Sequence, residues 1–183
     1  KVNMYYFIGI KGSGMSALAI ILKNLGYNVI GSDVENHFFT EEGLVENEIK
    51  FLTYDENNIK EDYVIVKGAS IKEDNVELIK ARELGLKIYE YNELVGEISK
   101  KFKTICIAGC HGKTTTTSMM SLVLEKLCGA NYLIGDGRGY ANPNNELFLL
   151  ESCEYQRHFL AYHPYYTVIT NIDLDHVDYF KDI

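Results

Sequence analysis

The chain has 183 residues, a net charge of −8 at pH 7 and a pI near 5.1, and 46% of its residues are hydrophobic. This length suggests one domain, or one complete domain and part of another. The acidic charge argues against nucleic acid as a partner, because neutralising phosphates requires clustered Lys and Arg. No apolar stretch reaches the roughly 18 residues of a membrane span, so no membrane partner is expected.

The cysteines and the N-terminus indicate where the protein works. The four cysteines, Cys106, Cys110, Cys128 and Cys153, form no C-x-x-C pair. They therefore indicate neither a disulfide framework nor a zinc site, and we expect reduced thiols in a cytoplasmic protein. Residues 1–10 do not resemble a signal peptide, because their short apolar run leads into Gly and Lys instead of a small-residue cleavage site.

The first hundred residues alternate short apolar runs with stretches of helical spacing. We expect strands over residues 5–8, 28–31, 63–66 and 87–89, and helices over residues 16–25, 76–84 and 93–98. Gly26 and Gly85 follow the first two helices, and glycine is common just past a helix end. Strands that alternate with helices predict parallel βαβ units.

The same pattern starts again after residues 100–103, which form a plausible domain junction. We expect a helix over residues 114–127 and strands over residues 104–108, 132–134, 147–150 and 166–170. The last strand is expected near the edge of its sheet. The segment 135–145 is rich in Gly and Asn and is expected to be a loop. The sequence therefore predicts an α/β fold with two βαβ units in series.

A glycine cluster, Gly9-Ile10-Lys11-Gly12-Ser13-Gly14, lies between the first strand and the first helix. A Rossmann-type domain presents backbone N–H groups and a helix N-terminus to a pyrophosphate at this point. Asp33 lies 19 residues after Gly14, where an acidic residue usually meets a ribose hydroxyl. Lys11 occupies the place of the second fingerprint glycine, so a tight turn without a ligand remains an alternative. The Lys11 ammonium either lies near a diphosphate or points into solvent.

A second cluster, Gly109-Cys110-His111-Gly112-Lys113-Thr114, also follows a strand and opens a helix. It is a shortened relative of the Walker loop. Its glycines let the backbone N–H groups point inward at phosphate oxygens. Lys113 supplies a positive charge to the β- and γ-phosphates, and the Thr114 hydroxyl is suited to Mg²⁺. The cluster therefore predicts a site for ATP and Mg²⁺.

Two further side chains are candidates for the metal. Glu151 follows the apolar strand 147–150, and His176 follows the strand 166–170. Ligands collect at the carboxyl ends of the strands in such sheets, so both residues point to the same edge as the phosphate loop. Taken alone, Glu151 is equally well a solvated acid and His176 a surface or core histidine. Beside a Gly-Lys-Thr loop, the two together indicate a metal site.

Four motifs in chain order carry a family resemblance. They are Gly9-Ile10-Lys11-Gly12-Ser13-Gly14-Met15-Ser16, Gly31-Ser32-Asp33, Gly109-Cys110-His111-Gly112-Lys113-Thr114-Thr115-Thr116 and Thr170-Asn171-Ile172-Asp173-Leu174-Asp175-His176. Together they resemble the Mur ligases of peptidoglycan synthesis, over nearly the whole chain. The chain departs from the family pattern at Lys11, where Gly is usual, at Cys110, where Thr is usual, and at Val76, where Pro often follows Asn.

The resemblance implies a Rossmann-like parallel-sheet domain over residues 1–101, which holds UDP-N-acetylmuramate. The start of a P-loop ATPase α/β domain follows over residues 102–183. It further implies a ligase that uses ATP and Mg²⁺ to join L-alanine to the lactyl carboxylate of UDP-N-acetylmuramate through an acyl phosphate. The amine-binding part lies beyond residue 183 in this interpretation, so we expect the chain alone to be inactive.

The resemblance also assigns roles to individual residues. The catalytic residues are Lys113, Glu151 and His176. The ATP-binding residues are Gly109, His111, Gly112, Lys113, Thr114 and Thr115. The magnesium ligands are Thr114, Glu151 and His176. The residues that bind the UDP-sugar are Gly12, Ser13, Gly14, Met15, Ser32 and Asp33.

Three other functions remain open at this point. One is a recycling ligase that attaches a preformed tripeptide to the same UDP-sugar. Another is a nucleotide-binding module without catalysis, against which Glu151 and His176 argue. A third is a dinucleotide-dependent oxidoreductase, which the first glycine cluster and Asp33 suggest. The Gly-Lys-Thr loop argues against this last function, because such enzymes do not need it.

Overall fold

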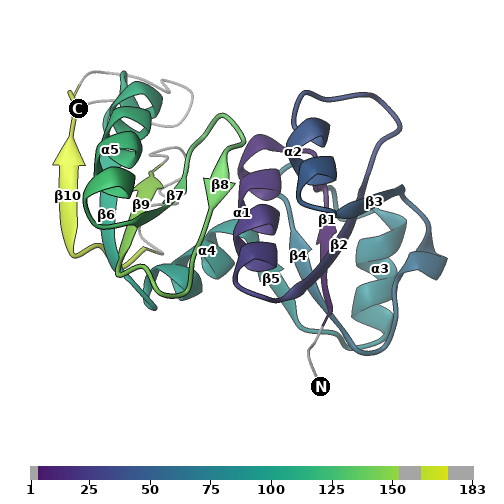
Figure 1. Ribbon diagram of the computed structural model, residues 1–183. Coiled ribbons are helices and arrows are strands. Elements are labelled where there is room, and N and C mark those ends of the chain that lie inside the picture. The colour runs from purple at the N-terminus through teal and green to yellow at the C-terminus, as the bar shows by residue number, and fades with distance from the viewer. Residues whose placement is uncertain (1–3, 153–161, 173–183) are drawn as a thin grey trace.

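The computed structural model describes residues 4–152 and 162–172, which form two sheets lying side by side (Figure 1). Within these residues the first sheet consists of β1 (Met4–Ile8), β2 (Asn28–Asp33), β3 (Lys50–Thr53), β4 (Tyr63–Lys67) and β5 (Ile88–Glu90). Their order across the sheet is β3-β2-β1-β4-β5, and every neighbouring pair is parallel. The predicted Rossmann-like α/β class is therefore confirmed. No helix of the described residues is long and apolar enough to cross a membrane.

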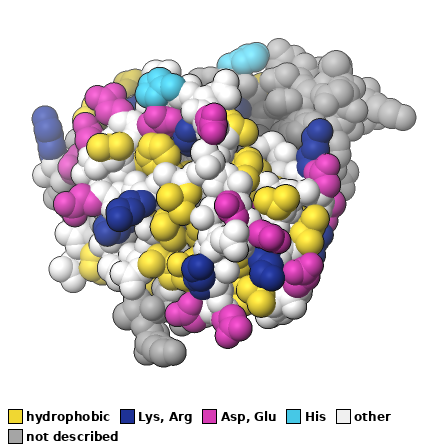
Figure 2. All heavy atoms as spheres, turned by 90° about the vertical axis from the view of Figure 1, so that its right-hand side faces the viewer, with side chains coloured by type: hydrophobic (Ala, Val, Ile, Leu, Met, Phe, Trp, Pro, Cys, Tyr) yellow, Lys and Arg dark blue, Asp and Glu magenta, His cyan; other side chains and the backbone are white. Residues whose placement is uncertain are grey.

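Helices cover both faces of this sheet. They are α1 (Ser13–Asn24), α2 (Glu41–Glu46), the 3-10 turn η1 (Glu56–Asn58), α3 (Val76–Glu83) and α4 (Tyr91–Ser99). Side chains of a strand alternate between faces, so Phe7 of β1 packs with α1 and α4, whereas Tyr6 and Ile8 pack with α3. The face of the molecule turned away from the second sheet carries interspersed acidic and basic side chains (Figure 2).

The second sheet repeats this pattern around one long helix. Its elements are β6 (Lys103–Ala108), α5 (Lys113–Leu127), β7 (Ala130–Leu133), β8 (Gly139–Tyr140), β9 (Leu147–Glu151) and β10 (Tyr166–Ile169). The strand order among the described residues is β10-β6-β9-β7-β8, and only the β7–β8 pair is antiparallel. Within the described ranges β10 lies at the edge of this sheet, as expected for the last strand, and its Tyr166 and Ile169 are exposed.

The structure adds four short elements to the predicted ones, namely α2, β3, η1 and β8. Strand β3 is four residues long and lies at a sheet edge, and helix α2 has six residues, so neither shows a full period in the sequence. The prediction of a loop over residues 135–145 was wrong for Gly139 and Tyr140, which form β8. Gly is depleted in strands, and this pairing depends on the distant strand β7.

Helix α1 is the contact between the two sheets (Figure 1). Each residue from Met15 to Leu22 is buried, because the first sheet covers one side of the helix and the β7–β8 hairpin covers the other. The hairpin approaches so closely that a Cβ atom added at Gly139 would overlap the carbonyl group of Ala17. A hydrogen bond from the Ala141 amide to Asn24 Oδ1 (3.1 Å) fixes the end of this contact. The approach therefore requires glycine at position 139.

One hydrophobic core runs through this contact. Phe7 and Leu18 of the first sheet and its helix belong to the same buried cluster as Leu133, Phe148 and Leu150 of the second sheet. Truncating a buried leucine to alanine typically costs about 2–5 kcal/mol. The two sheets therefore hold a fixed relative position, because separating them exposes core side chains.

A buried carboxylate organises the other face of the first sheet. Glu77 of α3 has no exposed surface and accepts hydrogen bonds from Tyr6 Oη (2.8 Å), Asn58 Nδ2 (2.9 Å) and the Asp55 amide (3.2 Å). The Ser32 hydroxyl donates to its second oxygen. Burial raises the pKa of Tyr6, so its phenol stays protonated and donates. Glu77 therefore connects β1, β2 and the η1 turn to α3.

We expect Glu77→Ala to lower the free energy of unfolding by about 2–4 kcal/mol, because it leaves several buried donors without an acceptor. Glu77→Gln keeps an acceptor oxygen and serves as the matched control, with a smaller loss. Urea unfolding followed by circular dichroism measures both. Equal midpoints for the alanine and glutamine variants would contradict this role.

Candidate functional site

Both glycine clusters lie at the carboxyl ends of parallel strands and open toward one cavity. Its volume is about 450 Å³, and residues of both sheets line it. The first sheet contributes the predicted residues Gly12, Ser13, Gly14 and Met15, and the second contributes Lys113 and Glu151. The structure therefore brings six predicted site residues together across the contact between the sheets.

The second cluster forms the predicted phosphate loop between β6 and α5. Gly112 adopts φ +79° directly before Lys113 begins α5. The Lys113 ammonium donates to the Gly109 carbonyl (2.5 Å). A smaller cavity of about 310 Å³ is lined by Cys110, His111, Gly112, Lys113, Thr114, Thr115 and Glu151. Lys113 and Glu151 line both cavities, so they lie where the contents of the two would meet.

Two residues after β10 hold the phosphate loop from outside. Asn171 accepts a hydrogen bond from the His111 amide (3.0 Å) and donates to the His111 carbonyl (2.9 Å), which also accepts from the Thr170 hydroxyl (2.6 Å). A Cβ atom at Gly109 would overlap the Thr170 hydroxyl. Thr170 and Asn171 were predicted only as part of the family motif, with no role of their own. Their position directly after β10, which pairs with the strand that precedes the phosphate loop, was the sequence signal for this contact.

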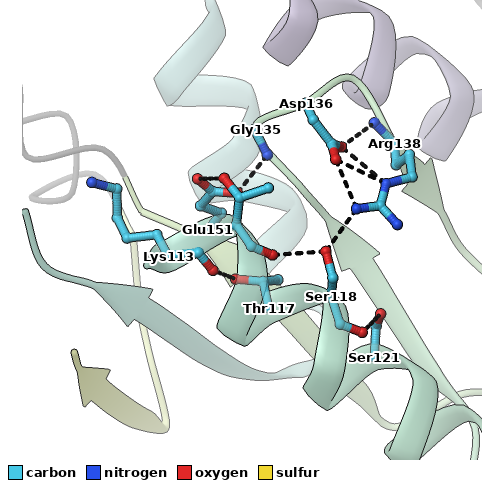
Figure 3. Close-up of polar contacts among 9 residues, drawn as sticks. Lys113, Thr117, Ser118, Ser121, Gly135, Asp136, Arg138 and Glu151 are labelled. Atoms are coloured by element: carbon cyan, nitrogen blue, oxygen red, sulfur yellow. Dashed lines mark hydrogen bonds and ion pairs between the residues drawn. The ribbon is translucent and has the colours of Figure 1, made fainter. Parts of the chain in front are cut away.

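The Glu151 carboxylate is held on both oxygens (Figure 3). Thr114 Oγ1 donates to Oε1 (2.8 Å), and the Gly135 amide donates to Oε2 (2.7 Å). A hydroxyl beside a carboxylate is a pair of oxygen ligands of the kind that Mg²⁺ prefers in proteins. Both groups line the cavity at the phosphate loop, so their chemistry fits a magnesium ion.

The third predicted metal residue, His176, lies outside the described residues. Within residues 4–152 and 162–172, no group of three or more His, Cys, Asp or Glu side chains is placed to hold a metal ion.

Ser32 and Asp33 lie beneath the first loop, where both are buried. Asp33 Oδ2 accepts from the Lys11 amide (2.8 Å), and the Ser32 carbonyl accepts from the amides of Gly9 (2.9 Å) and Ile10 (3.0 Å). The Ser32 hydroxyl is bonded to Glu77. In this structure the end of β2 therefore fixes the course of the loop that lines the cavity.

Lys11 follows neither of its two expected positions. Its side chain is buried, and its ammonium pairs with Glu41 (2.6 Å) and donates to the carbonyls of Val34 (2.9 Å) and Asn36 (2.8 Å). The Lys11 ammonium holds the pKa of the Glu41 carboxyl below its usual value. Lys11 thus ties the first loop to the segment after β2, which is a structural reason for a residue other than glycine.

The cavity also contains residues that the sequence analysis missed. Gly68, Ala69 and Ser70 follow β4, and Tyr91 begins α4. The signal for the first three was again the carboxyl end of a parallel strand. No sequence pattern indicates Tyr91, because the contact of its ring with the N-terminus of α1 depends on the tertiary structure.

Comparison with known proteins agrees with this arrangement. The family model described as "Mur ligase family, catalytic domain" matches residues 4–103, and the model described as "Mur ligase middle domain" matches residues 107–183. The first match covers more than half of the chain.

Two curated relatives of this chain carry the same name. The chain is 49% identical over 183 residues to a UDP-N-acetylmuramate–L-alanine ligase from Lactiplantibacillus plantarum, covering 100% of this chain and 42% of the relative. It is 49% identical over 179 residues to the protein of that name from Ligilactobacillus salivarius, covering 98% and 40%. The chain thus spans about two fifths of the length of these relatives.

Two solved structures share the fold. The UDP-N-acetylmuramate:L-alanyl-γ-D-glutamyl-meso-diaminopimelate ligase from Neisseria meningitidis superposes with a TM-score of 0.86 at 28% identity, covering 100% of this chain and 64% of that one. The UDP-N-acetylmuramate–alanine ligase from Thermotoga maritima gives 0.80 at 27%, covering 96% and 43%. The two glycine loops and these matches agree with one another, and the chain belongs to the Mur ligase family.

Proposed function

We propose that the protein containing this chain is an ATP-dependent ligase that joins L-alanine to the lactyl carboxylate of UDP-N-acetylmuramate in peptidoglycan synthesis. The observation that carries the proposal is the place of Lys113 and Glu151, which line both the cavity between the sheets and the cavity at the phosphate loop. A group transferred between two bound substrates must pass such a point. We also place the protein in the cytoplasm.

The larger cavity is our proposed site for the UDP-sugar. The residues from Gly12 to Met15 surround the N-terminus of α1, where helix N–H groups and the helix dipole favour a diphosphate. Ser32 and Asp33 support this loop from below, where Asp33 Oδ2 accepts a hydrogen bond from the Lys11 amide (2.8 Å). We propose that Asp33 also contacts the ribose of the UDP-sugar. We propose that residues 1–101 form the domain that binds the UDP-sugar.

The smaller cavity is our proposed site for the triphosphate of ATP. The loop from Gly109 to Gly112 and the first turn of α5 provide the N–H groups, and Thr115 and His111 belong to its lining. Thr114 and Glu151 would hold Mg²⁺, together with His176. The bound ion would offset the negative charge of the phosphates and polarise the γ-phosphate.

The chemistry to be catalysed is the approach of two anions. The lactyl carboxylate attacks the γ-phosphate, which breaks the bond to ADP and forms an acyl phosphate. The alanine amine then attacks the acyl carbon, and phosphate leaves. Lys113 is placed to neutralise the phosphoryl oxygens during the first transfer, once its ammonium exchanges the Gly109 carbonyl for phosphate.

The recycling ligase that attaches a tripeptide is the second candidate, because the Neisseria protein of that activity gives a TM-score of 0.86. The curated relatives at about 49% identity carry the L-alanine name and favour the first candidate.

We expect Lys113→Ala in the full-length enzyme to lower turnover by about 10²-fold or more, because one preorganised charge at the transferring phosphate is lost. Binding of the UDP-sugar stays nearly unchanged. Lys126→Ala removes the same charge near the far end of α5 and is the matched control. Measured rates of ADP release near the wild-type value in Lys113→Ala would exclude this assignment.

We expect UDP-N-acetylmuramate to raise the melting temperature of the chain, UDP to raise it less, and NAD to leave it unchanged. A ligand at 100 times its Kd stabilises by about 2.7 kcal/mol, which corresponds to several degrees. Differential scanning fluorimetry measures the three shifts. A shift with NAD and none with the UDP-sugar would favour the oxidoreductase function instead.

We expect the full-length enzyme to use L-alanine with a kcat/KM about 10-fold or more above that for the L-alanyl-γ-D-glutamyl-meso-diaminopimelate tripeptide. Product formation from each acceptor with ATP, Mg²⁺ and UDP-N-acetylmuramate gives the ratio. The reverse preference would assign the protein to tripeptide recycling.

A further inference from the structure

The turn between β7 and β8 lies directly against the Glu151 carboxylate. Its Gly135 amide donates to Glu151 Oε2 (2.7 Å), and a Cβ atom at Gly135 would lie 2.9 Å from Oε1. The turn itself is closed by the hydrogen bonds from the Ile134 amide to the Arg138 carbonyl (2.9 Å) and from the Gly137 amide to the Ile134 carbonyl (3.2 Å). The orientation of Glu151 therefore depends on where this turn lies.

Arg138 anchors the turn to the helix of the phosphate loop (Figure 3). Its Nη2 atom donates to Ser118 Oγ of α5 (2.6 Å) and to Asp136 Oδ2 (2.7 Å), and Nε donates to both Asp136 oxygens (3.1 and 3.0 Å). Ser118 Oγ in turn donates to the Thr114 carbonyl (2.7 Å).

These contacts close a ring around the carboxylate. Thr114 holds Glu151 Oε1 with its hydroxyl, and its carbonyl leads through Ser118 to Arg138. The turn that carries Arg138 returns through Gly135 to Glu151 Oε2. We propose that Arg138 is a positioning residue, which fixes the β7–β8 turn on α5 and so holds Glu151 in the orientation that a magnesium ion at Thr114 requires.

Hydrogen bonds to Asp136 orient the Arg138 guanidinium. The guanidinium lowers the pKa of the Asp136 carboxyl, and the carboxylate raises the pKa of Arg138, so the pair stays charged near neutral pH. A planar guanidinium serves Asp136 and Ser118 at once, which a lysine ammonium does less well. Asp136 and Ser118 take the hydrogen bonds of the guanidinium, and Glu151 accepts from Thr114 and Gly135 instead.

The test compares Arg138→Gln with wild type in the full-length enzyme. In nucleotide-free enzyme, we expect hydrogen exchange of the peptide containing Gly135 to be about 3–10-fold faster, because the turn loses its anchor. We expect the Mg²⁺ concentration for half-maximal ADP release to rise about 3–10-fold, as for other residues that orient a metal ligand. Arg138→Lys is expected between the two.

Arg82→Gln is the matched control. Arg82 of α3 is 50% exposed and pairs with Glu73, which precedes that helix, and Arg138 is 55% exposed and pairs with Asp136. The control keeps wild-type values in both measurements, and equal urea midpoints show that all variants fold. Unchanged exchange at Gly135, or an unchanged Mg²⁺ requirement, would overturn the proposal. The Mg²⁺ measurement rests on the proposed ligase function. If wild-type enzyme forms no product, that function fails, and the exchange rates alone decide the role of Arg138.

Discussion

The packing of α1 between the first sheet and the β7–β8 hairpin is the contact on which the site depends. Backbone meets backbone where Gly139 lies against Ala17, so any side chain at position 139 would push the two sheets apart. The loop from Gly9 to Gly12 leads into α1, and the turn that carries Gly135 leads into β8. Because the same contact fixes both segments, it also sets the cavity that they line.

Sequence reasoning predicted the parts of the site that follow from strand order. In a parallel sheet, residues just past the strands meet at one edge, and this rule placed Lys113 and Glu151 together. The same rule predicted the loop from Gly12 to Met15. It works because the strand before each of these residues fixes its place at the edge of its own sheet. The full burial of α1 had a signal too, since the run from Ala17 to Leu22 is apolar on all sides.

The remaining features depend on partners that are distant in sequence. Lys11 carries the charge expected of a phosphate ligand, yet Glu41 and two carbonyls take its ammonium into the interior. The role of Arg138 depends on Ser118, which is 20 residues earlier on another element. A motif states which side chains a loop offers. It does not state which of these side chains make contacts within the protein instead of with a ligand. Long-range packing determines those contacts.

Lys113 and Arg138, the two basic residues near Glu151, illustrate how packing determines what a side chain contacts. Among the described residues, the carboxylate accepts only from neutral groups, the Thr114 hydroxyl and the Gly135 amide. The Lys113 ammonium is bonded to the carbonyls of its own loop, and the Arg138 guanidinium is bonded to Asp136. A direct ion pair with either would neutralise Glu151 and weaken its attraction for an incoming metal ion. Neutral donors fix its geometry while leaving its charge available, which is what the role proposed for Glu151 as a magnesium ligand would require.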